Sequence, residues 1–220
     1  MGQFENRSGV QWFPVRVQIV QVLSGSSNNA LRHNGTMFAP SIMEIQKALE
    51  RLADGLGRYQ WLQAKVLKCN VTTDREFQRR FTAFYRVRRN SEWRREFFAL
   101  MEKSKSGGIN FSEALRAIHR STGRIEASFA SKMVATLDPA KPVIDKFVLR
   151  CFKLRLPNWG LADREENTIE LYLKLCRKYD GFMTSPDGVK IRNMFDERYP
   201  DAKIMDIKKI DLVLWQIRPN

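Results

Sequence analysis

Apolar residues recur at helical spacing through most of the chain after residue 40. In residues 42–57 they stand at positions 42, 45, 49, 52 and 56, and Gly55 and Gly57 are typical stop signals. Similar spacing predicts further helices over 74–89, 91–103, 112–121, 127–137, 146–154, 163–180, 187–199 and 206–217. Few stretches have the composition of a strand. We therefore expect an all-α domain of eight to ten helices over residues 41–220.

The first 40 residues have a different pattern. Residues 10–23 alternate apolar and polar side chains and predict a strand or an amphipathic arm, and residues 24–35 are polar and turn-rich, as in a flexible link. We interpret residues 1–40 as an N-terminal arm or linker. The sequence leaves open whether they belong to the protein, because Met37 and Met43 are alternative starting points.

Positive charge is concentrated in the middle of the chain. The 220 residues carry a formal net charge of +14. Residues 68–162 hold 20 basic and 9 acidic side chains, whereas residues 1–67 hold 7 and 4, and residues 163–220 hold 11 and 11. A local excess of this size attracts polyanions, and nucleic acid is the most common of these.

The cysteine and histidine content argues against several classes of protein, including disulfide-linked and histidine-rich metal-binding ones. Cys69, Cys151 and Cys176 are isolated and odd in number, which favours reduced thiols in a cytoplasmic protein. With only His33 and His119, the chain offers no histidine-rich metal cluster, so we expect neither a metal nor a cofactor. No apolar run approaches 18 residues, so we expect no membrane span. The sequence does not indicate an oligomeric state.

Arginines and aromatic residues alternate in residues 77–98. The arginines are Arg79, Arg80, Arg86, Arg88, Arg89, Arg94 and Arg95. Guanidinium groups pair with phosphates, and aromatic rings can stack on unpaired bases. Arg86, Arg89 and Trp93 would share one helical face if the helix ran through Asn90. The phenylalanines are better explained as core: Phe77, Phe81, Phe84 and Phe98.

Residues 112–137 predict two helices joined by the short hairpin Thr122-Gly-Arg-Ile-Glu126. Gly123 would allow the tight bend, and small residues such as Ser128 would let the helices approach closely. A hairpin of this kind can direct backbone N–H groups at a phosphate, although any helical hairpin fits the pattern equally.

Asp145 opens the next predicted helix after the turn Asp138-Pro-Ala-Lys-Pro142. Aspartate is a preferred helix cap, because its side chain accepts a hydrogen bond from the first turn. The alternative is a catalytic carboxylate directed at DNA. Composition alone favours the cap.

Residues 123–150, GRIEASFASKMVATLDPAKPVIDKFVLR, resemble the signature of helix-hairpin-helix DNA glycosylases. The nearest likeness is to the archaeal-type 8-oxoguanine DNA glycosylases. It is carried by Glu126-Ala-Ser128, by Ile144-Asp145-Lys-Phe-Val-Leu-Arg150 and by Asp211-Leu-Val-Leu-Trp215. The resemblance implies a helix-hairpin-helix fold, double-stranded DNA with a damaged or modified base as partner, and Asp145 as the catalytic carboxylate. The residues expected at the DNA are Arg86, Arg89, Trp93, Gly123, Arg124, Ser128, Lys146 and Arg150.

The chain departs from this family at the hairpin lysine. Bifunctional members place a lysine there that forms a Schiff base with the sugar. Here the matching position is Ile125 or Ser128, depending on the alignment. Arg124 stays protonated and cannot replace the lysine. Lys132 lies one turn beyond Ser128 and could act only if the helix were rotated. The resemblance therefore implies a monofunctional enzyme acting through Asp145, or a relative that has lost catalysis.

Three other functions fit parts of the sequence. One is a non-catalytic DNA-binding module on the same scaffold, and another is an RNA-binding protein that uses the segment 77–98. The third is a nuclease, since Pro186-Asp187 and Asp206-Ile-Lys208 match a PD…DxK string. That chemistry needs carboxylates on adjacent strands, whereas here both aspartates have the sequence context of turns and helix starts. Phosphate-loop and nucleophile-elbow signatures are absent from the sequence.

Overall fold

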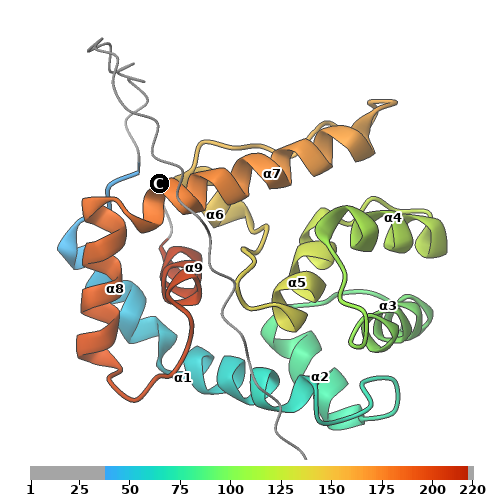
Figure 1. Ribbon diagram of the computed structural model, residues 1–220, viewed down its shortest axis with the longest axis horizontal. Helices are drawn as coiled ribbons and strands as arrows, with labels where there is room; N and C mark the ends of the chain where they lie inside the picture. Colours follow the sequence, from blue (N-terminus) through green and yellow to red (C-terminus); the bar gives the residue numbers. More distant parts are fainter. Residues whose placement is uncertain (1–37, 218–220) are drawn as a thin grey trace, which may run out of the picture. The chain divides into compact units, whose positions relative to one another are not determined.

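The structure is a computed structural model that describes residues 38–217. The described part is all-α and contains nine helices and no strand (Figure 1). They are α1 (Ile42–Val66), α2 (Arg75–Phe84), α3 (Ser91–Lys103), α4 (Phe111–Thr122), α5 (Ala127–Leu137), α6 (Lys146–Cys151), α7 (Arg164–Met183), α8 (Pro186–Arg198) and α9 (Asp206–Gln216). The predicted fold class is thus confirmed. The predicted N-terminal arm lies almost wholly outside the described residues.

Side-chain caps fix where several helices begin. Ser41 and Glu44 form a reciprocal capping box at α1, and Asn110 does the same with Glu113 at α4. The Asn90 side chain accepts a hydrogen bond from the Trp93 N–H, at 2.9 Å, and begins α3. These polar caps satisfy backbone donors that have no partner inside the helix.

α1 continues past the two glycines that we expected to end it. Tyr59, Leu62 and Val66 extend its buried apolar stripe by two further turns. A helical glycine costs about 1 kcal/mol relative to alanine, which is less than the burial of one large apolar side chain contributes. The predicted stop at Gly55 and Gly57 was therefore wrong, because tertiary packing outweighs helix propensity.

Two other helices are shorter than predicted. α2 ends at Phe84 and α6 ends at Cys151, rather than at residues 89 and 154. In both cases a non-glycine residue takes a left-handed backbone conformation soon after the end: Arg86 and Lys153 each have φ of 53°. The sequence carries no glycine or asparagine there to signal such a turn.

The helices form two groups that meet along α1 (Figure 1). α9 packs against α1, α6, α7 and α8. α4 packs against α3 and α5, and it also contacts α7. α1 joins the groups, because it contacts α2 and α5 as well as α8 and α9.

The phenylalanines of the segment 77–98 lie in the core, as predicted. Phe77, Phe81, Phe84 and Phe98 are all buried. The Phe81 ring lies 5.9 Å from the Phe77 ring and 5.6 Å from the Phe98 ring, measured between centroids. Aromatic pairs at this separation add to the free energy gained from burial alone. These rings hold α2 against α3 and are not available to stack on bases.

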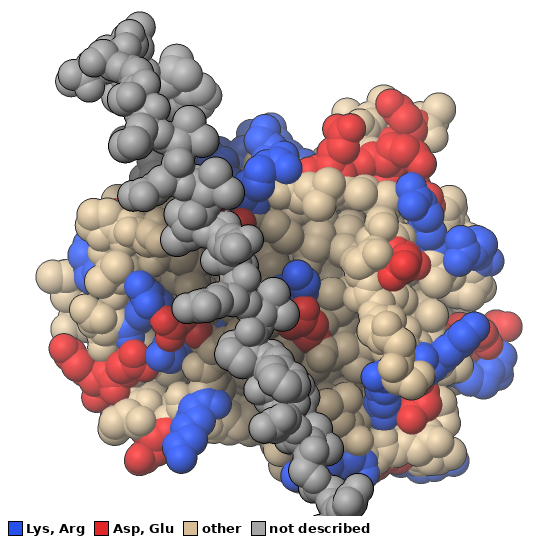
Figure 2. All heavy atoms as spheres, viewed as in Figure 1, with Lys and Arg blue, Asp and Glu red and all other residues tan. Residues whose placement is uncertain are grey.

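Charged side chains are spread over the surface. On the face shown in Figure 2, basic side chains are scattered and do not merge into one patch. Acidic side chains gather over the start of α7, the helix whose first turn contains Glu165 and Glu166. Among residues 38–217, no helix is both long enough and apolar enough to cross a membrane.

Candidate functional site

The predicted helical hairpin is present between α4 and α5. Gly123 ends α4 with φ of 67°, and its N–H donates to the His119 carbonyl at 2.8 Å. No other atom approaches within 4 Å of where a Cβ would stand, so the backbone angle is what requires glycine. Arg124, next in the chain, is exposed.

Asp145 caps α6, as the sequence predicted. Its carboxylate accepts a hydrogen bond from the Phe147 N–H at 2.8 Å. Ile144, the residue before it, is hydrogen-bonded to α5 through both its carbonyl and its N–H. The Ser128 hydroxyl donates to the Ile144 carbonyl at 2.9 Å, and the Ile144 N–H donates to the Ser131 hydroxyl at 2.8 Å. These bonds fix the position of the Asp145 carboxylate relative to α5.

Lys132, one turn beyond Ser128, is directed into the interior of the domain. Only 8% of the residue is exposed, and its Nζ donates to the Tyr85 carbonyl at 3.3 Å. Burial lowers the pKa of this ammonium to about 8, the Asp145 carboxylate partly opposes that shift, and the Arg86 guanidinium adds to it. Nζ is thus held in the interior of the domain, next to the end of α2.

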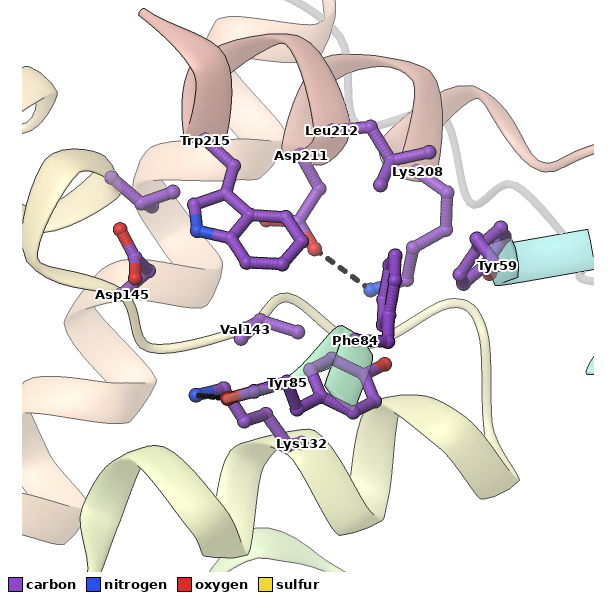
Figure 3. A pocket seen from close by; sticks show the side chains of 11 residues that line it. Tyr59, Phe84, Tyr85, Lys132, Val143, Asp145, Lys208, Asp211, Leu212 and Trp215 are labelled. Carbon is purple, nitrogen blue, oxygen red and sulfur yellow. Dashed lines mark hydrogen bonds and ion pairs between the residues drawn. The ribbon is translucent and has the colours of Figure 1, made fainter. Parts of the chain in front are cut away.

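Lys132 and Asp145 line the same pocket (Figure 3). Trp215, Leu212, Asp211 and Lys208 enter it from α9, Tyr59 from α1, Phe84 and Tyr85 from the end of α2, and Val143 and Val148 from around the start of α6. In Figure 3, Trp215 lies across the pocket from Tyr85 and Lys132. The Trp215 ring meets the Phe84 ring edge-on, with 5.3 Å between centroids.

The pocket is narrow in this conformation. Its cavity volume is about 20 Å³. A single water molecule needs roughly 10–15 Å³ on the same kind of measure, so one or two waters fit. Trp215, half-buried at the end of α9, forms part of the pocket wall.

A buried ionic network, which the sequence did not predict, forms one wall of the pocket. Lys208 is 2% exposed, and its Nζ donates to Asp211 at 2.9 Å and to the Lys141 carbonyl at 2.6 Å. The other Asp211 oxygen accepts from the Tyr179 hydroxyl at 2.7 Å. The network ties α9 to α7 and to the turn that leads to Asp145. The spacing of apolar residues predicted the helix over 206–217 but did not indicate that its charged residues Lys208 and Asp211 are buried.

Arg86, Arg89 and Trp93 do not share a helical face. The predicted helix through Asn90 was wrong, because α2 ends at Phe84 and Asn90 caps the separate helix α3. Arg89 forms a two-pronged ion pair with Glu126, at 2.8 to 3.0 Å, which links the start of α3 to the start of α5. Trp93 is buried, and its ring packs 4.9 Å from that of Phe129.

Some of the expected DNA contacts are accessible. Arg124 is exposed and borders an open depression of about 720 Å³ beside the hairpin, which the ion-paired Arg89 and the buried Trp93 also line. Lys146 and Arg150 are exposed on α6, and the Lys146 Nζ lies 4.7 Å from the centre of the Phe147 ring. Arg86 is exposed near Lys132. The structure therefore brings some of these residues together and leaves others apart.

The nuclease pattern has a structural explanation. Asp187 lies in the first turn of α8 and pairs with Lys190 at 2.7 Å. Asp206 begins α9 and pairs with Arg192 at 2.6 Å and Lys209 at 2.8 Å. In the described part of the chain, no group of three or more His, Cys, Asp or Glu residues is placed to hold a metal ion.

Comparison with known proteins assigns no family. No family model, no curated protein and no solved structure matches the chain. The resemblance to DNA glycosylases rests on the short motifs quoted above.

Proposed function

We propose that this protein removes a damaged or modified base from double-stranded DNA, with its chemistry in the pocket that holds Lys132 and Asp145. One observation carries the proposal. A buried lysine whose pKa is lowered to about 8 and a carboxylate fixed by a helix start line one aromatic-walled pocket. Perturbed titratable groups that converge in a pocket are characteristic of catalytic sites.

Asp145 would act on the sugar. As the bond between C1′ and the base weakens, positive charge develops on the sugar ring, and a nearby carboxylate stabilises it. The bonds from Ser128 and Ser131 to Ile144 hold the chain immediately before this carboxylate, so little reorganisation is needed during the reaction.

Lys132 supplies an amine that the hairpin itself lacks. In its neutral form Nζ can attack C1′, and the base departs with the bonding electron pair and takes up a proton. Loss of a proton from nitrogen and opening of the sugar ring then give an imine. A pKa of about 8 leaves a sizeable neutral fraction at physiological pH, which an exposed lysine does not have. This role departs from the monofunctional enzyme that the resemblance implies.

The base would enter where Trp215 now lies. Extruding a nucleotide costs a few kcal/mol in unstacking, and damaged bases cost least. Rotation of Trp215 away from Phe84 would enlarge the pocket, and its indole could then stack on the base. The polar wall formed by Lys208 and Asp211 would face the same space.

A lesion panel tests the proposal. Duplexes that contain uracil, 8-oxoguanine, hypoxanthine or an alkylated base are incubated with excess protein, and strand cleavage is scored after alkali. Excision of at least one base, lost when Lys132 and Asp145 are both replaced, supports the proposal. Duplex binding without excision would favour the non-catalytic module, and a preference for single-stranded RNA would favour the RNA-binding protein.

A further inference from the structure

A second basic site lies outside the pocket, in a groove between α2 and α3. The groove has an open volume of about 780 Å³. Four arginines line it, Arg75 and Arg79 from α2 and Arg94 and Arg95 from α3, and no acidic residue does. Phe98 forms its floor and is 2% exposed.

The arginines of the groove make few contacts that stabilise the fold. Within residues 38–217, the side chains of Arg75, Arg79 and Arg94 form no ion pair or hydrogen bond. Arg95 reaches Glu92 and Glu96 only at 4.0 and 3.4 Å and is 70% exposed, so these contacts are weak.

The acidic residues next to Arg75 are engaged elsewhere. Glu76 pairs with Arg80 at 2.8 Å on another side of α2. Asp74 caps α2 through the Phe77 N–H at 2.8 Å and lies 3.9 Å from Lys65. Glu92 and Glu96 contact only Arg95, so Arg75, Arg79 and Arg94 keep their positive charge without an ion pair among the described residues.

The walls of the groove are fixed by uncharged contacts. Arg75, Arg79 and Thr82 lie on the face of α2 opposite the buried Phe77 and Phe81. The neighbouring turn is held by the Gln78 amide, which donates to the Val71 and Thr72 carbonyls at 2.8 and 2.9 Å. The arginines can thus be replaced without removing a bond that shapes the site.

The chemistry of the groove fits phosphates. Guanidinium groups match the geometry of phosphate oxygens, whereas the one aromatic ring is buried and offers no stacking surface. From Arg75 to Thr82, α2 rises about 10 Å. That length corresponds to about three nucleotides along one strand of duplex DNA. A single phosphate would leave most of the groove empty.

We infer that this arginine groove, Arg75–Arg79–Arg94–Arg95, binds the phosphate backbone of duplex DNA. Phe84 and Tyr85 at the C-terminal end of α2 line the pocket, so α2 contributes to both sites from different faces. The inference rests on the proposed function, because it takes DNA as the polyanion. Contacts of this kind position the duplex and read no sequence.

The test compares two triple variants that each remove three positive charges. One is Arg75→Gln/Arg79→Gln/Arg94→Gln in the groove. The control is Lys174→Gln/Arg177→Gln/Lys178→Gln on exposed positions of α7, where none of the three has an ion pair among the described residues. Affinity for an undamaged duplex is measured from 50 to 300 mM salt by fluorescence anisotropy.

Each lost phosphate contact lowers the log–log salt slope by about 0.9, so the groove variant should lose about 2 to 3 units. The control should stay within about one unit of the parent. Equal slopes for the two variants would overturn the inference. So would a groove variant that loses affinity for single-stranded RNA or for inorganic pyrophosphate but keeps the parent slope on duplex DNA.

The same variants separate this inference from the proposed function. Binding of undamaged DNA requires no excision, so the groove is tested even if no lesion is removed. If the parent does excise a base, the groove variant at saturating concentration and low salt should keep a single-turnover rate within about twofold of the parent, because its pocket is unchanged. If the parent excises a base and the groove variant keeps the parent salt slope, the inference about the groove is wrong while the proposed function stands.

Discussion

Lys132 occupies a position where its charged form is poorly solvated. Its Nζ has one protein acceptor, the Tyr85 carbonyl, and the Phe129 ring lies 5.2 Å away. Asp145 stabilises the ammonium but does not restore a normal pKa. Most lysines reach solvent with their long side chains. The proposed function rests on the burial of this one in the pocket that Asp145 also lines.

Borohydride should trap the protein covalently on DNA that contains the excised lesion. The imine formed at Lys132 is reduced to a stable amine, and the product is detected by denaturing electrophoresis. Lys132→Met should abolish trapping, since the apolar side chain fits a buried site but cannot form an imine. Lys178→Met, at an exposed position of α7, is the matched control and should trap like the parent. Excision without trapping would show that Asp145 acts alone.

The rate of imine formation should rise with pH and level off above about 8. Only the neutral amine attacks C1′, and burial holds the pKa of Lys132 near 8 instead of its usual value above 10. Below that pH the rate should fall about tenfold per unit, because the neutral fraction does. Single-turnover trapping between pH 6 and 9.5 measures the profile. A rate that is constant over this range would contradict attack by Lys132.

Single residues differed in how well the sequence predicted them. Asp145 follows Pro-Val-Ile at a helix start, and its role as a cap was evident. The direction in which the Lys132 side chain points was not evident from the sequence, because nine of the 11 residues of α5 are buried. A helix buried on all sides has no polar face, so periodicity cannot show how it is rotated. Lys208 and Asp211 were missed because their partners lie on distant segments.

At the scale of helices, local signals predicted the ends of some helices and failed for others. α3 and α5 span the predicted residues, and Gly123 ends α4 in the expected left-handed conformation. The errors lie at α1, α2 and α6, where packing determines the length. Arg86 and Lys153 adopt positive φ without any residue type that favours it.

Gly57→Ala should stabilise the protein by about 0.5–1 kcal/mol, because alanine loses less backbone entropy in a helix interior. No atom lies within 4 Å of the new Cβ, so no contact opposes the gain. Urea unfolding followed by circular dichroism measures the change. Gly188→Ala is the contrasting variant: its Cβ would stand 1.9 Å from the Phe182 carbonyl oxygen, and it should be clearly destabilised. A loss of stability at Gly57 would mean that α1 is interrupted there.

At the scale of the whole molecule, net charge predicted a class of partner but no binding surface. The excess in residues 68–162 is partly consumed within the fold, as in the pair Arg89–Glu126. Arg75, Arg79 and Arg94, which have no ion pair among the described residues, line the groove between α2 and α3, a feature that requires the two helices to be placed side by side. The sequence predicted the helices, the hairpin and the Asp145 carboxylate. The pocket depends on contacts between segments up to about 150 residues apart, and these emerge only on folding.

Asp145→Asn tests the central claim most directly. Asparagine caps a helix about as well as aspartate, so the bond to the Phe147 N–H and the stability of the protein should be retained. The charge that stabilises the sugar cation is lost. Single-turnover excision of the lesion found in the panel should therefore slow by at least about 10²-fold, equivalent to about 2.7 kcal/mol of barrier. DNA affinity should hold or rise. A folded Asp145→Asn protein that excises the base at the parent rate would contradict the account and leave Asp145 as a helix cap only.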